Sequence, residues 1–268
     1  MLRALLPLRR AVLVLPFLLL GLAGPGAAAP ALRIYAMDSR PISFRQDGQP
    51  DGLVVELAQL VQQRLGSHDP IEIVPWARAH TLALKEANVL LLSIVRTPER
   101  EQVLRFVGPV FQSHIAAFAV RSRAAELRAR DPSLLSLRAG ARRGSVFVSM
   151  ARAAGYHLTD ETNASENAAR MLMLGRFDLW FEGEEIAGNA LRSAGYQLDQ
   201  VEVMARLPPR PVYFAFSRNT PEALVQAWET ALAGLKRDGS FQRVHHKWLP
   251  GYELPAEPAP APSRRPPP

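Results

Sequence analysis

Short apolar runs alternate with segments of helical period along most of the chain. Residues 32–37 and 71–74 are typical of strands, and the apolar positions between 54 and 65 recur at helical spacing. The alternation continues with a predicted helix over 77–86 and predicted strands over 89–94 and 115–120. This order favours βαβ units, in which helices cover mostly parallel sheets. The sequence therefore predicts an α/β fold.

The same alternation starts again after an arginine-rich stretch, residues 121–130. The predicted elements that follow are a strand over 137–141, helices over 145–154 and 165–174, strands over 177–181 and 212–216, and helices over 221–235 and 241–248. About 220 residues lie between the two ends of the chain, which is enough for two modest lobes. We interpret the restart as the beginning of a second lobe.

The first thirty residues have the pattern of a secretory signal peptide. Three arginines within residues 3–10 precede a twelve-residue apolar run from Ala11 to Leu22, and several alanines follow. The run is shorter than the roughly 20 apolar residues that span a bilayer, so an uncleaved anchor is the weaker interpretation. We expect a signal peptide over 1–28, cleavage within 28–31, and secretion of the mature protein into the periplasm.

The chain contains no cysteine. Disulfides, thiolate catalysis, thiolate metal sites and a lipid anchor on an N-terminal cysteine are therefore excluded. The six histidines, among them His245 and His246, are not spaced with acidic residues as metal ligands are. We expect no metal and no other cofactor, and hydrophobic packing must stabilise the fold by itself.

The formal net charge of the chain is +7, and loss of three arginines with the signal peptide lowers it to about +4. The basic residues are scattered and are not interleaved with aromatic side chains, so we expect no nucleic-acid partner. Proline dominates residues 251–268, where seven of the fourteen positions from Pro255 to Pro268 are proline. Such a segment cannot bury an apolar face, and we expect a disordered tail there.

Several short motifs follow one another along residues 41–249. They are Pro41-Ile42-Ser43-Phe44, Asp47-Gly48, Gly52-Leu53-Val54-Val55-Glu56-Leu57, Thr97-Pro98-Glu99-Arg100, Phe106, Gly108-Pro109, Gly144-Ser145, Gly175-Arg176-Phe177-Asp178, Asp238-Gly239-Ser240 and Lys247-Trp248-Leu249. In this order and spacing they resemble the family 3 extracellular solute-binding proteins, the periplasmic receptors of ABC importers for polar amino acids. The resemblance spans nearly the whole mature chain.

The resemblance implies the two-lobed periplasmic-binding-protein fold, or Venus flytrap, in which two strands cross between the lobes. Lobe 1 then comprises residues 32–119 and 217–250, and lobe 2 comprises residues 120–216. Closure about the crossing strands traps a ligand without chemical turnover, and an inner-membrane permease or a sensor reads the closed shape. We therefore expect a monomeric, non-enzymatic binding protein that captures a small polar metabolite for ABC-type import or sensing.

Two other functions stay open. Dehydratases that resemble this family exist, and Glu182 or Glu184 would serve as a general acid in a dry cleft. Against this alternative, no histidine–carboxylate or serine–histidine pair is brought together by the sequence. The other alternative is a periplasmic sensory module that is independent of transport.

Arg100 is the first candidate ligand contact. Thr97 and Pro98 form a helix-start signature, which puts Arg100 in the first turn, where its charge opposes the helix dipole. The resemblance implies that its guanidinium binds a ligand carboxylate, for which the fork of N–H groups is suited. The alternative is a surface ion pair with Glu99 or Glu101.

Further candidates follow the strand ends. Ser145 begins a helix whose free N–H groups favour an anion, although an ordinary capped turn is the alternative. The resemblance also implies a ligand wall formed by Phe44, Trp76 and Phe147, which would otherwise be core residues. We add Ser93, and Arg78 as a neighbour of the Trp76 wall.

Three departures from the family pattern bear on the ligand. Members that bind α-amino acids usually carry an aspartate for the ammonium group at the position of Gly183. The flanking Glu182 is a candidate in its place, although strand alternation directs neighbouring side chains to the opposite face. Val95 replaces a frequent hydroxyl residue, and Arg96 adds a positive charge. These departures favour organic acids or other anionic metabolites over an ordinary α-amino acid.

Overall fold

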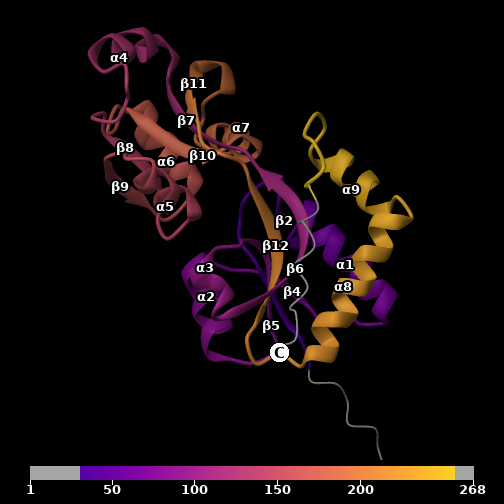
Figure 1. Ribbon diagram of the computed structural model, residues 1–268. Helices are drawn as coiled ribbons and strands as arrows, with labels where there is room; N and C mark the ends of the chain where they lie inside the picture. Colours follow the sequence, from indigo (N-terminus) through magenta and orange to yellow (C-terminus); the bar gives the residue numbers. More distant parts are fainter. Residues whose placement is uncertain (1–30, 257–268) are drawn as a thin grey trace, which may run out of the picture. The chain divides into compact units, whose positions relative to one another are not determined.

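The computed structural model describes residues 31–256, which form two lobes built on separate five-stranded sheets (Figure 1). The expected signal peptide and residues 257–268 of the expected tail lie outside the described residues. Within residues 31–256, no helix combines the length and apolar character needed to cross a bilayer.

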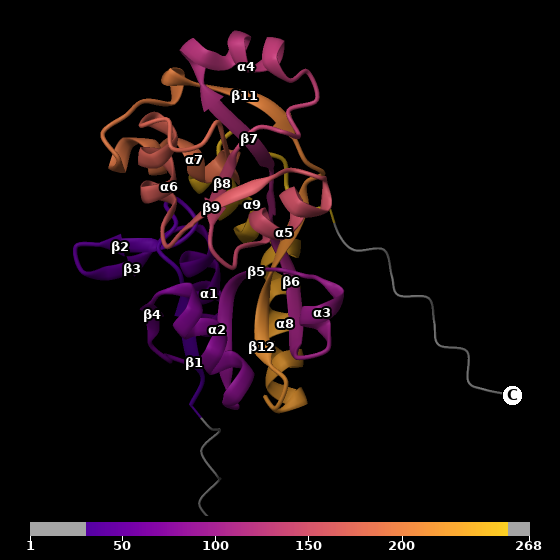
Figure 2. The same cartoon turned by 90° about the vertical axis from the view of Figure 1, so that its left-hand side faces the viewer.

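The sheet of the first lobe has the strand order β4-β1-β5-β12-β6. Its strands are β1 (Arg33–Ala36), β4 (Ile71–Ile73), β5 (Val89–Val95), β6 (Leu104–Ser113) and β12 (Arg210–Ser217). Three helices, α1 (Leu53–Leu65), α8 (Glu222–Arg237) and α9 (Ser240–Trp248), lie on one side, and α2 (Trp76–Lys85) and α3 (Pro98–Glu101) lie on the other (Figure 2). A hairpin of β2 (Phe44–Gln46) and β3 (Gln49–Asp51) precedes α1.

Alternation along the strands of this lobe divides its core between the two helical layers. Leu90 and Leu92 of β5 belong to the cluster that includes α1 and α8, whereas Val89 and Leu91 pack with α2. Side chains two residues apart share one face of a strand, so a continuous apolar run buries both faces. This explains why β5 has almost no polar positions.

The sheet of the second lobe has the order β11-β7-β10-β8-β9. Its strands are β7 (Ile115–Val120), β8 (Ala139–Arg142), β9 (Leu158–Thr162), β10 (Leu179–Gly183) and β11 (Val201–Arg206). Its helices are α4 (Ala124–Arg130), α5 (Val146–Ala153), α6 (Ser165–Met173) and α7 (Glu184–Ser193), with short 3₁₀ turns η1 (Arg121–Arg123) and η2 (Leu198–Gln200). Trp180 of β10 packs with α6 and α7, while Phe181 packs with α5. The sheet is therefore covered on both faces.

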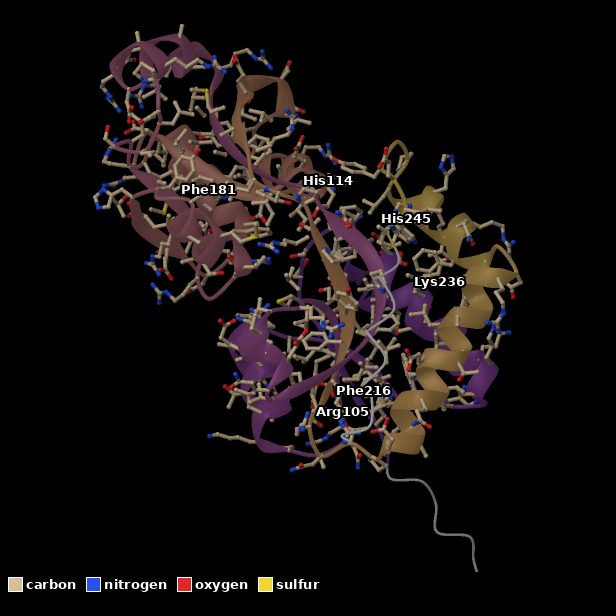
Figure 3. All side chains as sticks on the ribbon, in the orientation of Figure 1. Arg105, His114, Phe181, Phe216, Lys236 and His245 are labelled. Carbon is tan, nitrogen blue, oxygen red and sulfur yellow. The ribbon has the colours of Figure 1, made fainter. Side chains whose placement is uncertain are left out.

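The chain crosses between the lobes twice. It leaves the first sheet at Ser113 and enters the second at Ile115, with His114 at the junction (Figure 3), and it returns between Arg206 and Arg210. These crossings come several residues before the lobe boundaries at 119 and 216 that the resemblance implies. The reason is that β7 and β11 pair with each other inside the second sheet.

Both sheets are mixed rather than mostly parallel. In the first sheet β1 pairs in parallel with β4 and β5, while β12 is antiparallel to β5 and β6. In the second sheet β8 is parallel to β9 and β10, while β7 is antiparallel to β10 and β11. The antiparallel pairs in the two sheets all involve β12 or β7, since β12 runs against β5 and β6, and β7 runs against β10 and β11.

Strand β6 is absent from the sequence-based prediction, as are β9, β11 and α7. The sequence of β6 contains Gly108-Pro109, and a proline removes a backbone donor from a strand. The structure tolerates it because β6 is an edge strand, hydrogen-bonded only to β12. This segment can form a strand because it lies at the edge of the sheet, and the local sequence does not reveal that position.

Asp178 organises a cluster of arginines at the start of β10. Its carboxylate is 2% exposed, accepts hydrogen bonds from Arg130 at 2.9 Å and Arg138 at 3.3 Å, and lies 3.2 Å from a guanidinium nitrogen of Arg123. Burial opposes ionisation, but the hydrogen bonds and charges of Arg138 and Arg130 prevail and lower the pKa of Asp178. This carboxylate stabilises the second lobe.

Asp178→Asn should lower the free energy of unfolding by about 2 kcal/mol at pH 7, because three arginines lose a shared buried partner. Urea unfolding followed by circular dichroism measures this loss. Since folding lowers the pKa of Asp178, its contribution is present above the unfolded-state pKa of about 4 and is lost as the pH falls. The difference between wild type and variant should therefore shrink below about pH 4.

Asp199→Asn is the control, because Asp199 on η2 is exposed. Its unfolding free energy should stay within about 0.5 kcal/mol of wild type. Equal losses in both variants would contradict the assignment of a structural role to Asp178.

Candidate functional site

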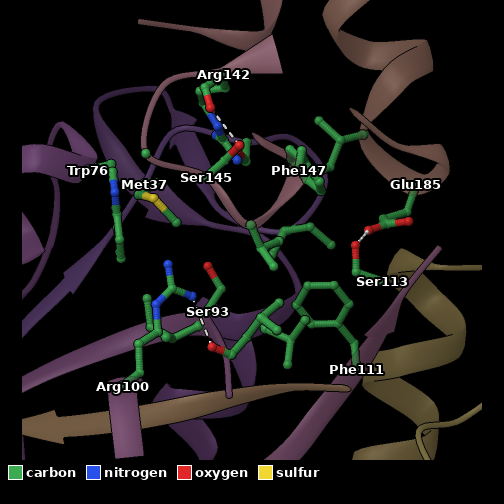
Figure 4. A pocket seen from close by; sticks show the side chains of 18 residues that line it. Met37, Trp76, Ser93, Arg100, Phe111, Ser113, Arg142, Ser145, Phe147 and Glu185 are labelled. Carbon is green, nitrogen blue, oxygen red and sulfur yellow. Dashed lines mark hydrogen bonds between the residues drawn. The ribbon is translucent and has the colours of Figure 1, made fainter. Parts of the chain in front are cut away.

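A cavity of about 70 Å³ lies between residues of the two lobes (Figure 4). The first lobe lines it with the segment after β1, the start of α2, the end of β5, α3, β6 and β12. The second lobe lines it with the end of β8 and the starts of α5 and α7. The strands and helices that surround the cavity come from distant parts of the sequence, and the two crossings bring them together.

Arg100 lies at one end of this cavity, beside Trp76 (Figure 4). Its backbone N–H donates to Thr97 Oγ1 at 3.3 Å, which confirms Thr97 as the cap of α3, and its Nη1 donates to the carbonyl oxygen of Val95 at 2.9 Å. The guanidinium carbon is 5.4 Å from the centroid of the Trp76 ring. Burial lowers the pKa of Arg100, although the charge of Glu99 opposes this, and arginine remains cationic at neutral pH.

Arg100 forms no ion pair with a carboxylate of residues 31–256. The sequence analysis gave an ion pair of Arg100 with Glu99 or Glu101 as the alternative to ligand binding, but Glu101 pairs with Arg96 instead. A half-buried guanidinium with one backbone acceptor and one aromatic neighbour retains N–H donors that point to no protein acceptor. This leaves the side chain suited to an anion in the cavity.

Trp76 and Gly144 bring the two lobes into contact beside Arg100. A Cβ atom at Gly144 would lie 3.1 Å from Trp76 Nε1, and the φ angle of Gly144 is +66°. Both the close approach and the left-handed backbone favour glycine at this position. Trp76 therefore forms a wall of the cavity that the loop after β8 closes from the opposite side.

Ser145 lies in the cavity lining, but its hydroxyl group does not cap α5. The hydroxyl donates to the carbonyl oxygen of Arg142 at 2.5 Å, and the Ser145 N–H donates to the same oxygen at 3.1 Å. No side chain accepts from the first N–H groups of α5. The first N–H groups of α5 therefore lie next to the cavity without a side-chain acceptor among the described residues.

Arg142 enters the cavity from the second lobe, although the sequence analysis did not select it. Its Nη1 donates to Ser39 Oγ of the first lobe at 2.8 Å, and its guanidinium carbon is 5.7 Å from the Phe147 ring centroid. The signal in the sequence was a pair of arginines, Arg142 and Arg143, between the predicted strand over 137–141 and Gly144-Ser145. The direction of its side chain is set by the place of Arg142 at the end of β8 in the second sheet, which the local sequence does not show.

Glu185 lies at the opposite end of the cavity from Arg100 (Figure 4). Its carboxyl group accepts a hydrogen bond from Ser113 Oγ at 2.6 Å and from the N–H of His114 at 3.2 Å. Burial raises the pKa of Glu185 to about 7, and these hydrogen bonds only partly oppose the shift. The residue thus joins α7 to the first crossing and changes charge near neutral pH.

The Glu185 carboxyl group fills the space next to Gly183. A Cβ atom at Gly183 would lie 2.5 Å from Glu185 Oε1, so a side chain at 183 and the present position of Glu185 exclude each other. The strand β10 ends at Gly183 and α7 begins with Glu184, so strand alternation no longer applies at Glu185. The sequence analysis considered Glu182 and Glu184 but missed this carboxylate.

The cavity brings together five of the nine candidate residues from the sequence. They are Arg100, Ser145, Trp76, Ser93 and Phe147. The other four, Phe44, Arg78, Arg96 and Glu182, are not part of its lining.

Each of these four has a different environment. Phe44 is buried and packs edge-on against Trp248, with ring centroids 5.7 Å apart. Arg78 is exposed on α2, because the helix turns it away from Trp76. Arg96 pairs with Glu101, and Glu182 is fully buried with one carboxyl oxygen unpartnered. Among residues 31–256, no three His, Cys, Asp or Glu side chains are grouped to hold a metal.

Glu185→Gln should change how stability depends on pH. Folding raises the pKa of Glu185, so its protonated form stabilises the fold fully below the unfolded-state pKa of about 4, and this contribution is lost as the pH rises through about 7. Between pH 5 and 8, the unfolding free energy of wild type should fall by about 2 kcal/mol relative to the variant. Urea unfolding at both pH values measures the difference.

Glu229→Gln serves as the control, because Glu229 is exposed on α8. Its curve of stability against pH should run parallel to that of wild type. A parallel curve for Glu185→Gln as well would show that Glu185 does not titrate in this range.

Solved structures of other proteins share this architecture. A histidine kinase sensor domain described as similar to periplasmic binding proteins has a TM-score of 0.73 at 22% identity, over 84% of this chain and 98% of that chain. A periplasmic His/Glu/Gln/Arg/opine family-binding protein from Silicibacter pomeroyi, solved with lysine, has a TM-score of 0.71 at 17% identity, over 84% and 100% of the two chains. At these identities, the likeness shows the fold.

A third similar structure is an ancestral amino-acid-binding protein that is a precursor of cyclohexadienyl dehydratase. Its TM-score is 0.68 at 19% identity, over 82% of this chain and 95% of that chain. A search of curated proteins found no match.

The comparison with protein families identifies the chain directly. The model for bacterial extracellular solute-binding proteins, family 3, matches residues 32–251, which are most of the sequence. The two mixed sheets, the paired crossings and the cavity between the lobes agree with this match. The chain belongs to family 3 of the bacterial extracellular solute-binding proteins.

Proposed function

We propose that this protein captures a small carboxylate-bearing metabolite between its lobes, for ABC-type import or for sensing. The observation that carries the proposal is the guanidinium of Arg100, which lines the cavity without a carboxylate partner in residues 31–256. Taking a charge even partly out of water is costly unless it is paired, and a ligand carboxylate would supply the partner with bidentate geometry. The protein acts as a secreted monomer of the periplasm.

The lining of the cavity supports a small, partly apolar ligand. Trp76 and Phe147 provide aromatic walls, and Ser93 and Ser145 provide polar groups in the lining, Ser93 from the first lobe and Ser145 from the second. A small-molecule site typically combines an apolar wall with a few polar groups that set orientation. These five residues are the proposed ligand contacts.

Closure of the lobes would couple binding to a signal. Contacts that join the lobes at the cavity include the hydrogen bond from Arg142 to Ser39, the hydrogen bond from Ser113 to Glu185, and the approach of Gly144 to Trp76. A ligand that binds both walls favours the closed arrangement, and a permease or a sensor domain then recognises it. Lobe 1 and lobe 2 move about the crossings at His114 and residues 207–209.

Glu185 extends the range of ligands to those that carry an amine. Its carboxyl group lies in the cavity and occupies the space where family members that bind α-amino acids would extend a side chain from position 183. In its ionised form it would pair with an ammonium group. The site therefore offers a partner for the amine of an amino acid as well as for the carboxylate of an organic acid, so the proposed ligands include amino acids.

An enzyme on the same scaffold is the second candidate. Glu185 supports it, since a carboxyl group with a pKa of about 7 in a cavity is suited to donate a proton. A similar structure is that of a precursor of a dehydratase. Binding without turnover is favoured, because no second acid or base beside Glu185 lines the cavity among residues 31–256.

Thermal melts of the purified protein test this proposal against a panel of amino acids, dicarboxylates, polyamines and sugar acids. A ligand at a hundredfold excess over its dissociation constant adds about 2.7 kcal/mol, which should raise Tm by roughly 5 °C. Arg100→Gln should abolish the shift, because the carboxylate loses its partner. Arg78→Gln, a change at an exposed arginine of the neighbouring helix, should keep it.

Binding that is lost equally in both variants, or kept in Arg100→Gln, would contradict the assignment to Arg100. Mass spectrometry of the incubated mixture separates the two functions. A ligand that is recovered unchanged supports a binding protein, and one that is consumed with time supports the enzyme.

A further inference from the structure

Arg142 and its neighbour Arg143 have different surroundings, although they follow each other in the sequence. Arg143 is exposed, and its Nη2 donates to the carbonyl oxygen of Glu161 within its own lobe at 3.2 Å. Arg142 is half-buried, lines the cavity and reaches Ser39 in the other lobe at 2.8 Å. The end of β8 therefore directs one of the two charges into the space between the lobes.

The guanidinium of Arg142 has no carboxylate partner within 4 Å in the part of the chain from 31 to 256. Its contacts are one neutral hydroxyl group, on Ser39, and the face of the Phe147 ring at 5.7 Å. A hydroxyl group satisfies one donor of the fork and leaves the charge uncompensated. Like Arg100, Arg142 therefore lacks a carboxylate partner among the described residues, and it lies on the opposite wall of the cavity.

The charges that line the cavity do not balance. Its lining contains two cations, Arg100 and Arg142, and one acidic group, Glu185. Glu182 is fully buried outside the lining, with one carboxyl oxygen unpartnered, and burial raises the pKa of Glu182 even though the charge of Arg142 opposes the shift. Even with Glu185 ionised, two cations and one anion line the cavity, so positive charge is in excess there.

We propose that Arg142 is a second anion-binding residue, and that the ligand carries two anionic groups, one held by Arg100 and the other by Arg142. This inference rests on the proposed function and narrows its ligand to a small dicarboxylate, with or without an amine. Each lobe then supplies one cation, so a ligand with two carboxylates pairs both charges only when the lobes close on it. A ligand with one carboxylate leaves one of the two arginines unpaired.

Calorimetric titration with matched ligand pairs tests this inference. The pairs are succinate with succinamate, aspartate with asparagine, and glutamate with glutamine, in which one carboxylate is replaced by an amide of the same size. In at least one pair the acid should bind wild type about tenfold or more tightly than its amide. Arg142→Gln should remove this preference by weakening the acid, and Arg143→Gln should preserve it.

Arg142→Lys covers the case in which Arg142→Gln does not fold. It keeps the charge and loses the fork, so the preference for the acid should decrease without disappearing. Circular dichroism melts establish that each variant used is folded.

Three results would overturn the inference. The first is that wild type binds acids and amides equally, or binds none of the six. The second is that the preference survives Arg142→Gln. The third is that Arg142→Gln weakens both members of a pair equally, since the residue then acts only by closing the lobes through Ser39. The proposed function stands in each case if a carboxylate of the wider panel binds in an Arg100-dependent way, and fails if none does.

Discussion

The pairing of β12 between β5 and β6 is the constraint on which the rest of this structure depends. This strand returns from the second lobe and hydrogen-bonds on both sides within the first sheet, antiparallel to each neighbour. The pairing of β12 therefore holds the second crossing, over residues 207–209, close to the first crossing at His114. The cavity forms where these crossings leave the sheet, so its lining includes the ends of β5 and β6 together with α3 and α7.

Electrostatics then determines what this cavity accepts. Taking a guanidinium out of water is costly, and many arginines of this protein offset the cost with a carboxylate, as the cluster around Asp178 does. Arg100 and Arg142 are exceptions at the cavity, where their other contacts are carbonyl, hydroxyl and aromatic groups. Glu185 lies at the opposite end of the cavity from Arg100, and its carboxyl group changes charge near neutral pH. The site thus combines fixed positive charge on both lobes with one titratable group.

Much of the fold was predictable from the sequence because its strands and helices have strong local periodicity. The helices α1, α5, α6, α8 and α9 agree with their predicted ranges within about two residues. Strand β6 was not predicted, since Gly108-Pro109 interrupts it and only its position at a sheet edge makes the proline tolerable. The site was predicted in part. Arg100 and Trp76 follow strand ends, whereas Arg142 and Glu185 reach the cavity only through the arrangement of the second lobe.

The sequence by itself determined the α/β class, the restart that marks a second lobe, the family motifs and the cap that begins α3 at Thr97. These features depend on residues that are close in the chain, where periodicity and hydrogen-bonding geometry act locally. Only the tertiary structure decided that β10 ends at Gly183, that Glu185 fills the space beside it, and that Arg142 faces Arg100. Arg142 and Arg100 are far apart in the sequence, and Glu185 is held beside Gly183 by the distant Ser113 and His114, so these relations depend on strand order and on the crossings between the sheets.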